Sequence, residues 1–216
     1  NLLSQSENVV IYSAPKAGKT SLIQQTILEM KAARKNFCTA SVEMHDLRDC
    51  TSFLCRMGDA ALRAYCTTPD EYRSIIAKLL PGTHFVFDQR NYSDHDRIVS
   101  LNWDPDENDV KAMLSLPFNL AKSEDKQLYL LLDDFQSITT FDGYEKLLKQ
   151  MEGVIREQRS LLEPVQCSLI ITGSRLNAMK DLFEHQHYFY RLCETFTMSP
   201  IDEKEVVEPI VKGFLT

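Results

Sequence analysis

The stretch Val9–Met30, VVIYSAPKAGKTSLIQQTILEM, decides the fold, because it joins an apolar segment to a helix through a short polar turn. The segment Val9–Tyr12 is apolar throughout, which is typical of a strand buried on both faces. The range Ser21–Lys31 has apolar residues at helical spacing, namely Leu22, Ile23, Ile27 and Met30. A buried strand that leads directly into a helix indicates an α/β protein with a parallel sheet.

The remainder of the chain continues this alternation of strands and helices. Further strands are predicted at Phe37–Val42, Gln127–Asp134 and Val165–Ser174. Helices are predicted at Thr51–Ala64, with Thr51 as the N-cap, and at Val110–Leu120 and Tyr144–Leu162. The span Thr67–Asp109 is polar, short on helical period and rich in turn residues. We therefore expect a three-layer α/β fold with a mostly parallel central sheet and helices on both faces.

Composition bounds the class of protein. The 216 residues are 44% hydrophobic and 25% charged, which is ordinary for a globular protein, and no apolar run approaches a membrane span. No secretory signal is recognised, and six cysteines without a Cys-x-x-Cys pair favour reduced thiols in the cytoplasm. The net charge of −7 argues against a broad nucleic-acid surface. Because the chain starts at Asn1 and stops inside an apparent element, we expect an excised part of a longer protein.

The turn after the first strand has the composition of a phosphate-binding loop. Ligands of parallel sheets bind at the carboxyl ends of the strands, where this turn begins. Gly18 lets the backbone approach a phosphate, and the backbone N–H groups and the helix start favour an anion. Lys19 would reach the outer phosphates, and the Thr20 hydroxyl would hold Mg²⁺. The candidate nucleotide-binding residues are Ser13, Ala14, Pro15, Lys16, Ala17, Gly18, Lys19, Thr20 and Ser21.

This loop departs at one position from the P-loop pattern G-x-x-x-x-G-K-[ST], because Ser13 stands where the first glycine is expected. Serine can follow the same path if its φ angle stays negative. The alternative is an ordinary strand–helix turn with a solvated Lys19.

Two carboxylates end the strand predicted at Gln127–Asp134. Asp133 is expected at the carboxyl edge of the sheet, where it would hold Mg²⁺ directly or through water. Asp134 falls where a residue that activates water would lie. Aspartate is one methylene shorter than glutamate, so slow hydrolysis or none is expected as well as turnover. The alternative is a strand that ends in two solvated acids.

A third strand, LIITGSR, also ends in polar residues. Thr172, Ser174 and Arg175 are candidates to contact the γ-phosphate, because charge-assisted bonds to phosphate are strong. The alternative is a strand-to-helix turn with Ser174 as an N-cap and Arg175 in solvent.

Four stretches of the chain together resemble one family. In chain order they are VVIYSAPKAGKTSLI, MLSLPFNLAKSEDKQLYLLLDDFQSI, LIITGSRLNAMKDLF and YFYRLCETFTMSPID. The chain resembles the prokaryotic AAA-like ATPases of the archaeal-type ATPase family, related to the STAND NTPases. The resemblance runs from Val9 to about Val211, and its most specific part is LPFNLA followed by a strand and Asp-x-Phe-Gln. That family usually has Asp-Glu where this chain has Asp133-Asp134, and Gly or Ala where it has Ser13.

The resemblance implies further assignments. Ser174 and Arg175 match the family's sensor, and Tyr190 and Arg191 match a Tyr-Arg pair before a final short strand. Residues 1–200 would be the ATPase core, and 201–216 would start the linker to a helical lid. The core would be of the additional-strand type, with Cys167–Thr172 between the P-loop strand and the magnesium strand. ATP, rather than another nucleotide, is implied by the resemblance alone.

Three other features suggest ligand sites only weakly. His185 and His187 lack the further ligands of a zinc site. The acidic residues of 104–109 do not fit the pattern of a calcium loop, because the glycine at its sixth position and the glutamate at its twelfth are missing. Trp103 is expected to pack rather than to stack on adenine.

The functional hypothesis is a domain that binds ATP and Mg²⁺ and acts as a nucleotide-dependent regulatory switch, with Lys19, Asp134 and Arg175 as catalytic residues. One alternative is an ATP-binding scaffold without turnover. A P-loop small-molecule kinase is a weaker alternative, because the stretch 83–97 offers only Arg90 and Arg97 for a lid. The expected partners are a protein or a second copy of the chain, nucleic acid only through domains outside this sequence, and no membrane.

Overall fold

The computed structural model describes residues 7–33, 35–88, 98–101, 104–161 and 166–198, to which the following description is limited. The main sheet contains β1 (Val9–Tyr12), β2 (Phe37–Glu43), β5 (Gln127–Asp133), β6 (Cys167–Gly173) and β7 (Glu194–Thr197). The longer helices are α1 (Lys19–Ala32), α2 (Cys50–Tyr65), α3 (Pro69–Leu79), α4 (Glu107–Ser123) and α5 (Tyr144–Ser160). Shorter helical segments are η2 (Met44–Asp46), η4 (Phe135–Thr140), α6 (Leu176–Lys180) and η5 (Asp181–His185).

The five strands lie in the order β2-β5-β6-β1-β7, and all four pairings are parallel. β6 is therefore inserted between β1 and β5, which confirms the predicted additional strand. Tyr12 pairs with Gly173, and Leu132 pairs with Ile171. The polar residues that follow these three strands consequently come together at one edge of the sheet.

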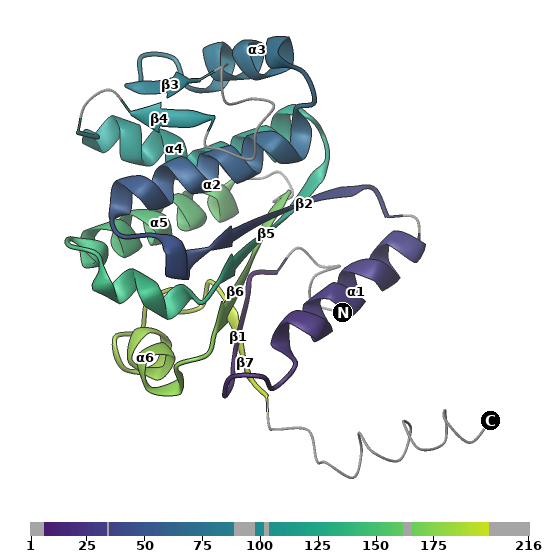
Figure 1. Ribbon diagram of the computed structural model, residues 1–216, viewed down its shortest axis with the longest axis vertical. Helices are drawn as coiled ribbons and strands as arrows, with labels where there is room; N and C mark the ends of the chain where they lie inside the picture. The colour runs from purple at the N-terminus through teal and green to yellow at the C-terminus, as the bar shows by residue number, and fades with distance from the viewer. Residues whose placement is uncertain (1–6, 34, 89–97, 102–103, 162–165, 199–216) are drawn as a thin grey trace.

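Helices cover both faces of the main sheet (Figure 1), and alternation along β1 divides the core into two layers. Val9 and Ile11 pack with Ile23 and Met30 of α1 on one face of the sheet. Val10 and Tyr12 belong to the larger cluster on the other face, which α2, α4 and α5 cover. The three-layer α/β fold expected from the sequence is confirmed.

The span Thr67–Asp109, for which no element is predicted, contains α3 and the antiparallel hairpin of β3 (Phe85–Phe87) and β4 (Val99–Leu101). Thr68 and Glu71 form a reciprocal capping box at the start of α3, and Pro69 is the first helical residue. The sequence Thr-Pro-Asp-Glu was thus a usable helix signal.

The predicted N-cap of α2 was wrong. Asp49, not Thr51, caps this helix, and its side chain accepts a hydrogen bond of 2.7 Å from the backbone nitrogen of Ser52. The six cysteines are free thiols, as predicted. Within the described residues, every helix is too short or too polar to cross a membrane. Trp103, Arg90 and Arg97, and the proposed lid start at 201–216, lie outside the described residues.

Candidate functional site

The loop between β1 and α1 has an unusual backbone. Gly18 has a φ angle of 87° and Lys16 one of 62°, so two residues of the turn adopt left-handed conformations. Glycine adopts this conformation without a steric penalty, whereas Lys16 does so at some cost. Ser13 is not among the residues with positive φ, so serine is compatible with the first position of the loop.

Lys19, the first residue of α1, points back into the loop. Its Nζ lies 3.1 Å from the Ser13 carbonyl oxygen, 3.2 Å from Ser13 Oγ and 3.1 Å from the Ala14 carbonyl oxygen. The residue is only 9% exposed. A buried ammonium group needs such acceptors, because desolvation of an unpaired charge is costly. The loop therefore holds a positive charge at the carboxyl end of β1.

The remaining loop residues divide by exposure. Ala17 is buried, whereas Pro15, Lys16, Thr20 and Ser21 are exposed. The exposed residues include Thr20, the predicted magnesium ligand.

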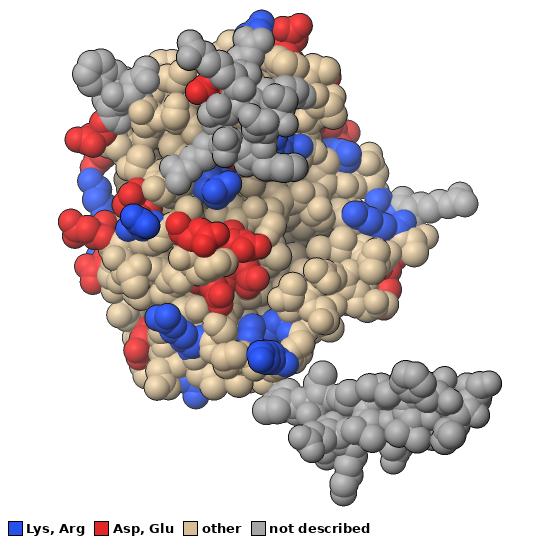
Figure 2. Space-filling view, in the orientation of Figure 1, with Lys and Arg blue, Asp and Glu red and all other residues tan. Residues whose placement is uncertain are grey.

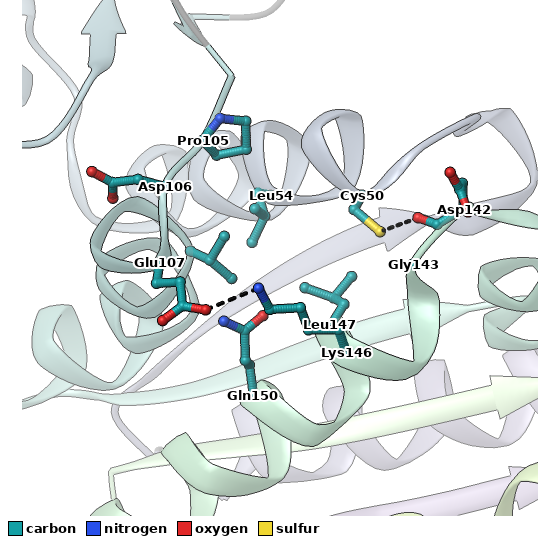
Figure 3. Close-up of a pocket in the computed structure, with 11 residues that line it drawn as sticks. Cys50, Leu54, Pro105, Asp106, Glu107, Asp142, Gly143, Lys146, Leu147 and Gln150 are labelled. Carbon is teal, nitrogen blue, oxygen red and sulfur yellow. Dashed lines mark hydrogen bonds and ion pairs between the residues drawn. The ribbon is translucent and has the colours of Figure 1, made fainter.

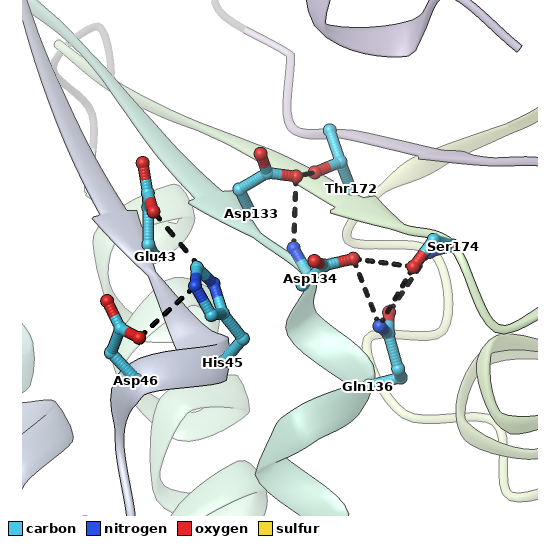
Figure 4. A network of polar contacts seen from close by, with 8 residues as sticks. All are labelled: Glu43, His45, Asp46, Asp133, Asp134, Gln136, Thr172 and Ser174. Carbon is cyan, nitrogen blue, oxygen red and sulfur yellow. Dashed lines mark hydrogen bonds and ion pairs between the residues drawn. The ribbon is translucent and has the colours of Figure 1, made fainter. Parts of the chain in front are cut away.

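Asp133 ends β5 at the same edge of the sheet. Its Oδ1 accepts hydrogen bonds from the Thr172 hydroxyl of β6 and from the backbone nitrogen of Asp134, 3.0 Å away (Figure 4). Both bonds use Oδ1, so Oδ2 is the atom that a metal ion would approach. Thr172, a candidate phosphate contact, donates its hydroxyl hydrogen to this carboxylate.

Asp134 follows in a left-handed conformation, with φ 53° and ψ 44°. Its Oδ1 accepts hydrogen bonds from Ser174 Oγ at 2.7 Å and from Gln136 Nε2 at 3.1 Å. Burial raises the pKa of Asp134, but the bonds from Ser174 and Gln136, with the nearby charges of His45 and Lys19, bring the pKa below its usual value of 3.8. The carboxylate is therefore strongly favoured in its ionised form.

The two sensor candidates, Ser174 and Arg175, make different contacts. Ser174 is half-buried and bonded to Asp134, so it is not the N-cap of the following helix. Arg175 is exposed and occupies the N-cap position of α6, with no hydrogen bond from its side chain to the helix. Ser174, and not Arg175, is thus the residue that bonds the Asp134 carboxylate in this structure.

Two contacts of this edge were not foreseen from the sequence. Gln136 is buried and links Asp134 to Ser174 (Figure 4). The hydroxyl of Tyr12, the last residue of β1, donates to Glu184 of η5, and burial followed by this carboxylate raises the pKa of Tyr12 to about 12. The signal for both was weak, because each contact joins segments that only the folded sheet brings together.

Acidic side chains extend the site along the sheet edge. At the end of β2, His45 lies 3.9 Å from Glu43 and 3.2 Å from Asp46, next to the Asp133–Asp134 pair (Figure 4). A group of acidic side chains occupies the middle of this face in Figure 2, with basic side chains below it. A polyanion that binds at Lys19 would therefore also meet negative charge, which a divalent cation would neutralise.

A separate cavity of about 220 Å³ lies where α2, α4 and α5 begin (Figure 3). Lys146 and Glu107 form an ion pair of 2.9 Å on its wall, and the Cys50 thiol donates to the Asp142 carbonyl oxygen. None of the eleven residues that line it belongs to the loop Ser13–Thr20 or to the ends of β5 and β6. It is thus distinct from the candidate site.

Comparison with known proteins shows which solved structures share this fold. No family model matches the sequence, and no curated protein does. A Walker-type ATPase of Pyrococcus abyssi has a TM-score of 0.58 at 12% identity, over 99% of this chain and 54% of that chain. The ORC2 protein of Aeropyrum pernix in its ADPNP–ADP complexes has a TM-score of 0.59 at 16% identity, over 98% and 47% of the two chains. The ORC1 protein of the same organism in complex with DNA has a TM-score of 0.52 at 10% identity, over 96% and 44%.

The chain has the fold of the Walker-type ATPases. At these identities the similarity establishes the fold alone. The chain spans about half the length of these neighbours, from 44% to 54%.

Proposed function

We propose that this chain binds Mg·ATP in the loop Ser13–Thr20 and acts as a nucleotide-dependent regulatory switch. The observation that carries the proposal is the position of Lys19, a buried cation held by three oxygen atoms of the loop that it would exchange for phosphate oxygens. The left-handed turn at Gly18 leads into the start of α1, and no side chain caps that end of the helix. The first backbone N–H groups of the helix would favour an anion there. Charge and backbone geometry thus both favour a phosphate chain there.

Magnesium would be held by the Thr20 hydroxyl and by Asp133. Both offer oxygen atoms, the ligands that this hard cation prefers, and the residues therefore fit it. When bound, the ion would neutralise the phosphate charge beside the Asp133–Asp134 pair.

Turnover would use the residues around Asp134. In this proposal Asp134 orients the attacking water, and Lys19, Ser174 and Arg175 contact the γ-phosphate. Loss of that phosphate would remove these contacts and shift the domain to another arrangement, which is the basis of a switch.

A second candidate function is ATP binding without turnover. Asp134 is shorter than glutamate, and its Oδ1 already accepts bonds from Ser174 and Gln136. A general base must come within hydrogen-bond reach of water, and these contacts hold Asp134 towards β6. This observation favours slow hydrolysis or none.

The same proposal covers the family, the domain bounds, the compartment and the partners of this chain. We place the chain with the archaeal-type, STAND-related ATPases, with residues 1–200 as the core and 201–216 as the start of a lid. Six free cysteines favour a reducing compartment, and we propose the cytoplasm. The ORC1 neighbour from Aeropyrum pernix was solved with DNA. For this chain we propose a protein partner or self-association, and nucleic-acid contact only through further domains.

The test is calorimetric titration of Mg·ATP into the chain and into Lys19→Ala. We expect binding in the first and its loss in the second. Lys31→Ala is the matched control, because it removes the same charge from the exposed last turn of α1 and should bind as the unaltered chain does. Equal affinity in Lys19→Ala would refute the site.

A further inference from the structure

Gln136 is a buried amide that does not belong to the nucleotide loop or to the metal ligands. It lies on η4, three residues after Asp133, and is 3% exposed. Its Nε2 lies 3.1 Å from Asp134 Oδ1 and 3.3 Å from Ser174 Oγ, and its Oε1 accepts from the Ser174 backbone nitrogen at 3.2 Å. One side chain therefore ties the end of β5 to the end of β6.

These contacts determine where the Ser174 hydroxyl can direct its proton. A serine hydroxyl has one proton to donate, and here it donates to Asp134 Oδ1 at 2.7 Å. The Gln136 Nε2 amide group lies within hydrogen-bond distance of both members of this pair, the serine oxygen and the carboxylate oxygen. Ser174 is therefore kept as a donor, and Asp134 keeps a second donor if the serine bond is broken.

The packing around Gly173 accommodates this arrangement. A Cβ atom at Gly173 would lie 2.8 Å from Gln136 Oε1 and 2.3 Å from Met179 Sδ. Both distances are shorter than the contacts that Cβ atoms make in proteins. Glycine at the end of β6 thus leaves the space that the glutamine carbonyl occupies.

We propose that Gln136 is a positioning residue that allows the Ser174 hydroxyl to move its hydrogen bond from Asp134 to the γ-phosphate of bound ATP. The inference rests on the proposed function, because it requires a triphosphate at Lys19. A phosphate oxygen and the Asp134 carboxylate compete for one proton. When the phosphate takes it, Gln136 remains bonded to Asp134, so the buried carboxylate is not left without a donor.

This mechanism predicts a selective effect on triphosphate binding. Gln136→Met keeps similar volume but donates nothing, so moving the serine bond leaves Asp134 without either side-chain donor. The affinity for Mg·ATP should fall about tenfold, as expected for one charge-assisted hydrogen bond. The affinity for Mg·ADP, which has no γ-phosphate, should stay within about twofold, because the serine bond to Asp134 remains intact.

The chain contains a matched control at the other end of β5. Gln127 Nε2 donates to Ser168 Oγ of β6 at 3.1 Å, so Gln127→Met also removes a glutamine–serine contact between these strands. A general effect on the sheet would appear in both variants, whereas the ratio of ATP to ADP affinity should change only in Gln136→Met.

The experiment is calorimetric titration of the chain, Gln136→Met and Gln127→Met with the magnesium complexes of a non-hydrolysable ATP analogue and of ADP. A fall of the affinity ratio confined to Gln136→Met supports the proposal. Gln136→Leu, which is apolar, of similar size and likewise donates nothing, should give the same result if the methionine variant does not fold. Ser174→Ala should also lower the ratio.

An unchanged ratio in the folded Gln136 variants, or in Ser174→Ala, would overturn the inference while nucleotide binding at Lys19 stood. Failure of the unaltered chain to bind, or equal binding by Lys19→Ala, would instead remove the proposed function and this inference with it.

Discussion

The ammonium group of Lys19 lies 3.2 Å from the hydroxyl oxygen of Ser13, a contact that the glycine of the usual motif cannot make. Ser13 is 1% exposed and its hydroxyl also donates to the Ala14 carbonyl oxygen at 3.2 Å. The departure from the motif thus adds an acceptor for the lysine. In the nucleotide-free chain, this acceptor competes with phosphate for the same cation.

Ser13→Ala should therefore bind Mg·ATP more tightly. With one acceptor fewer, the Lys19 ammonium group can move more easily from the loop to a phosphate oxygen. The affinity for Mg·ATP should therefore rise about fivefold, equivalent to about 1 kcal/mol. Calorimetry gives the dissociation constant, and Thr26→Ala is the control, since its hydroxyl donates to the Leu22 carbonyl within α1. Weaker binding in Ser13→Ala would mean that the hydroxyl assists the phosphate.

Gly173→Ala should destabilise the fold. Its Cβ would meet the Met179 side chain at 2.3 and 2.4 Å and Gln136 at 2.8 Å, and Met179 is fully buried. Overpacking of this kind costs about 1–3 kcal/mol of the free energy of unfolding. Urea denaturation measures the loss. Gly153→Ala in α5 is the matched variant: its Cβ meets nothing within 4 Å, so we expect it to stabilise by about 0.5–1 kcal/mol.

The contact between His84 and Asp109 should make stability depend on pH. The ring Nδ1 lies 2.8 Å from Asp109 Oδ2, and this hydrogen bond and the carboxylate charge raise the pKa of His84 above 6.5. Burial raises the pKa of Asp109, but bonds from the His84 backbone and ring and from the Asp106 backbone bring it below 3.8. The folded state therefore binds the histidine proton more tightly than the unfolded chain does.

The stabilisation by His84 is fully present below pH 6.5 and is lost as the pH rises through the raised pKa of the folded state. That of Asp109 is present above pH 3.8 and is lost as the pH falls through its lowered pKa. Urea denaturation from pH 6 to pH 9 should show a decline in the free energy of unfolding that is smaller in His84→Gln. An identical decline in the variant would exclude this histidine as the cause.

Local patterns predicted the elements that position the site. Val9–Tyr12 was predicted with the bounds that β1 has, and the strand at Gln127–Asp134 differs from β5 by one residue. The contacts within the site depend instead on strand order. Thr172 reaches Asp133 across 39 positions of sequence because β6 lies beside β5. Gln136 is included in the sequence prediction only as the last residue of the Asp-x-Phe-Gln motif, because its partner Ser174 is 38 positions away.

The left-handed conformation of Asp134 was also beyond local prediction. Aspartate and asparagine tolerate this conformation better than most residues, but nothing in the surrounding letters requires it. It turns the carboxylate towards β6, where Ser174 and Gln136 bind it. The choice between turnover and binding alone depends on this geometry.

Asp134→Asn tests that choice. Asparagine suits the left-handed backbone and keeps an oxygen acceptor for Ser174 and Gln136, but it cannot take a proton from water. We expect Mg·ATP affinity within about twofold of the unaltered chain. Single-turnover phosphate release should fall by about 100-fold or more, the usual contribution of a general base.

Asp125→Asn is the matched control for this substitution. Asp125 also has a positive φ angle, 47°, and its carboxylate accepts a bond from Gln166 just before β5 begins, at the end of that strand opposite to Asp134. Its replacement should leave phosphate release unchanged. Turnover retained in Asp134→Asn would remove Asp134 from the water-activating role. Absence of release from the unaltered chain, with Mg·ATP bound, would instead establish the second candidate function, because a carboxylate held by Ser174 and Gln136 would then serve the bound state alone.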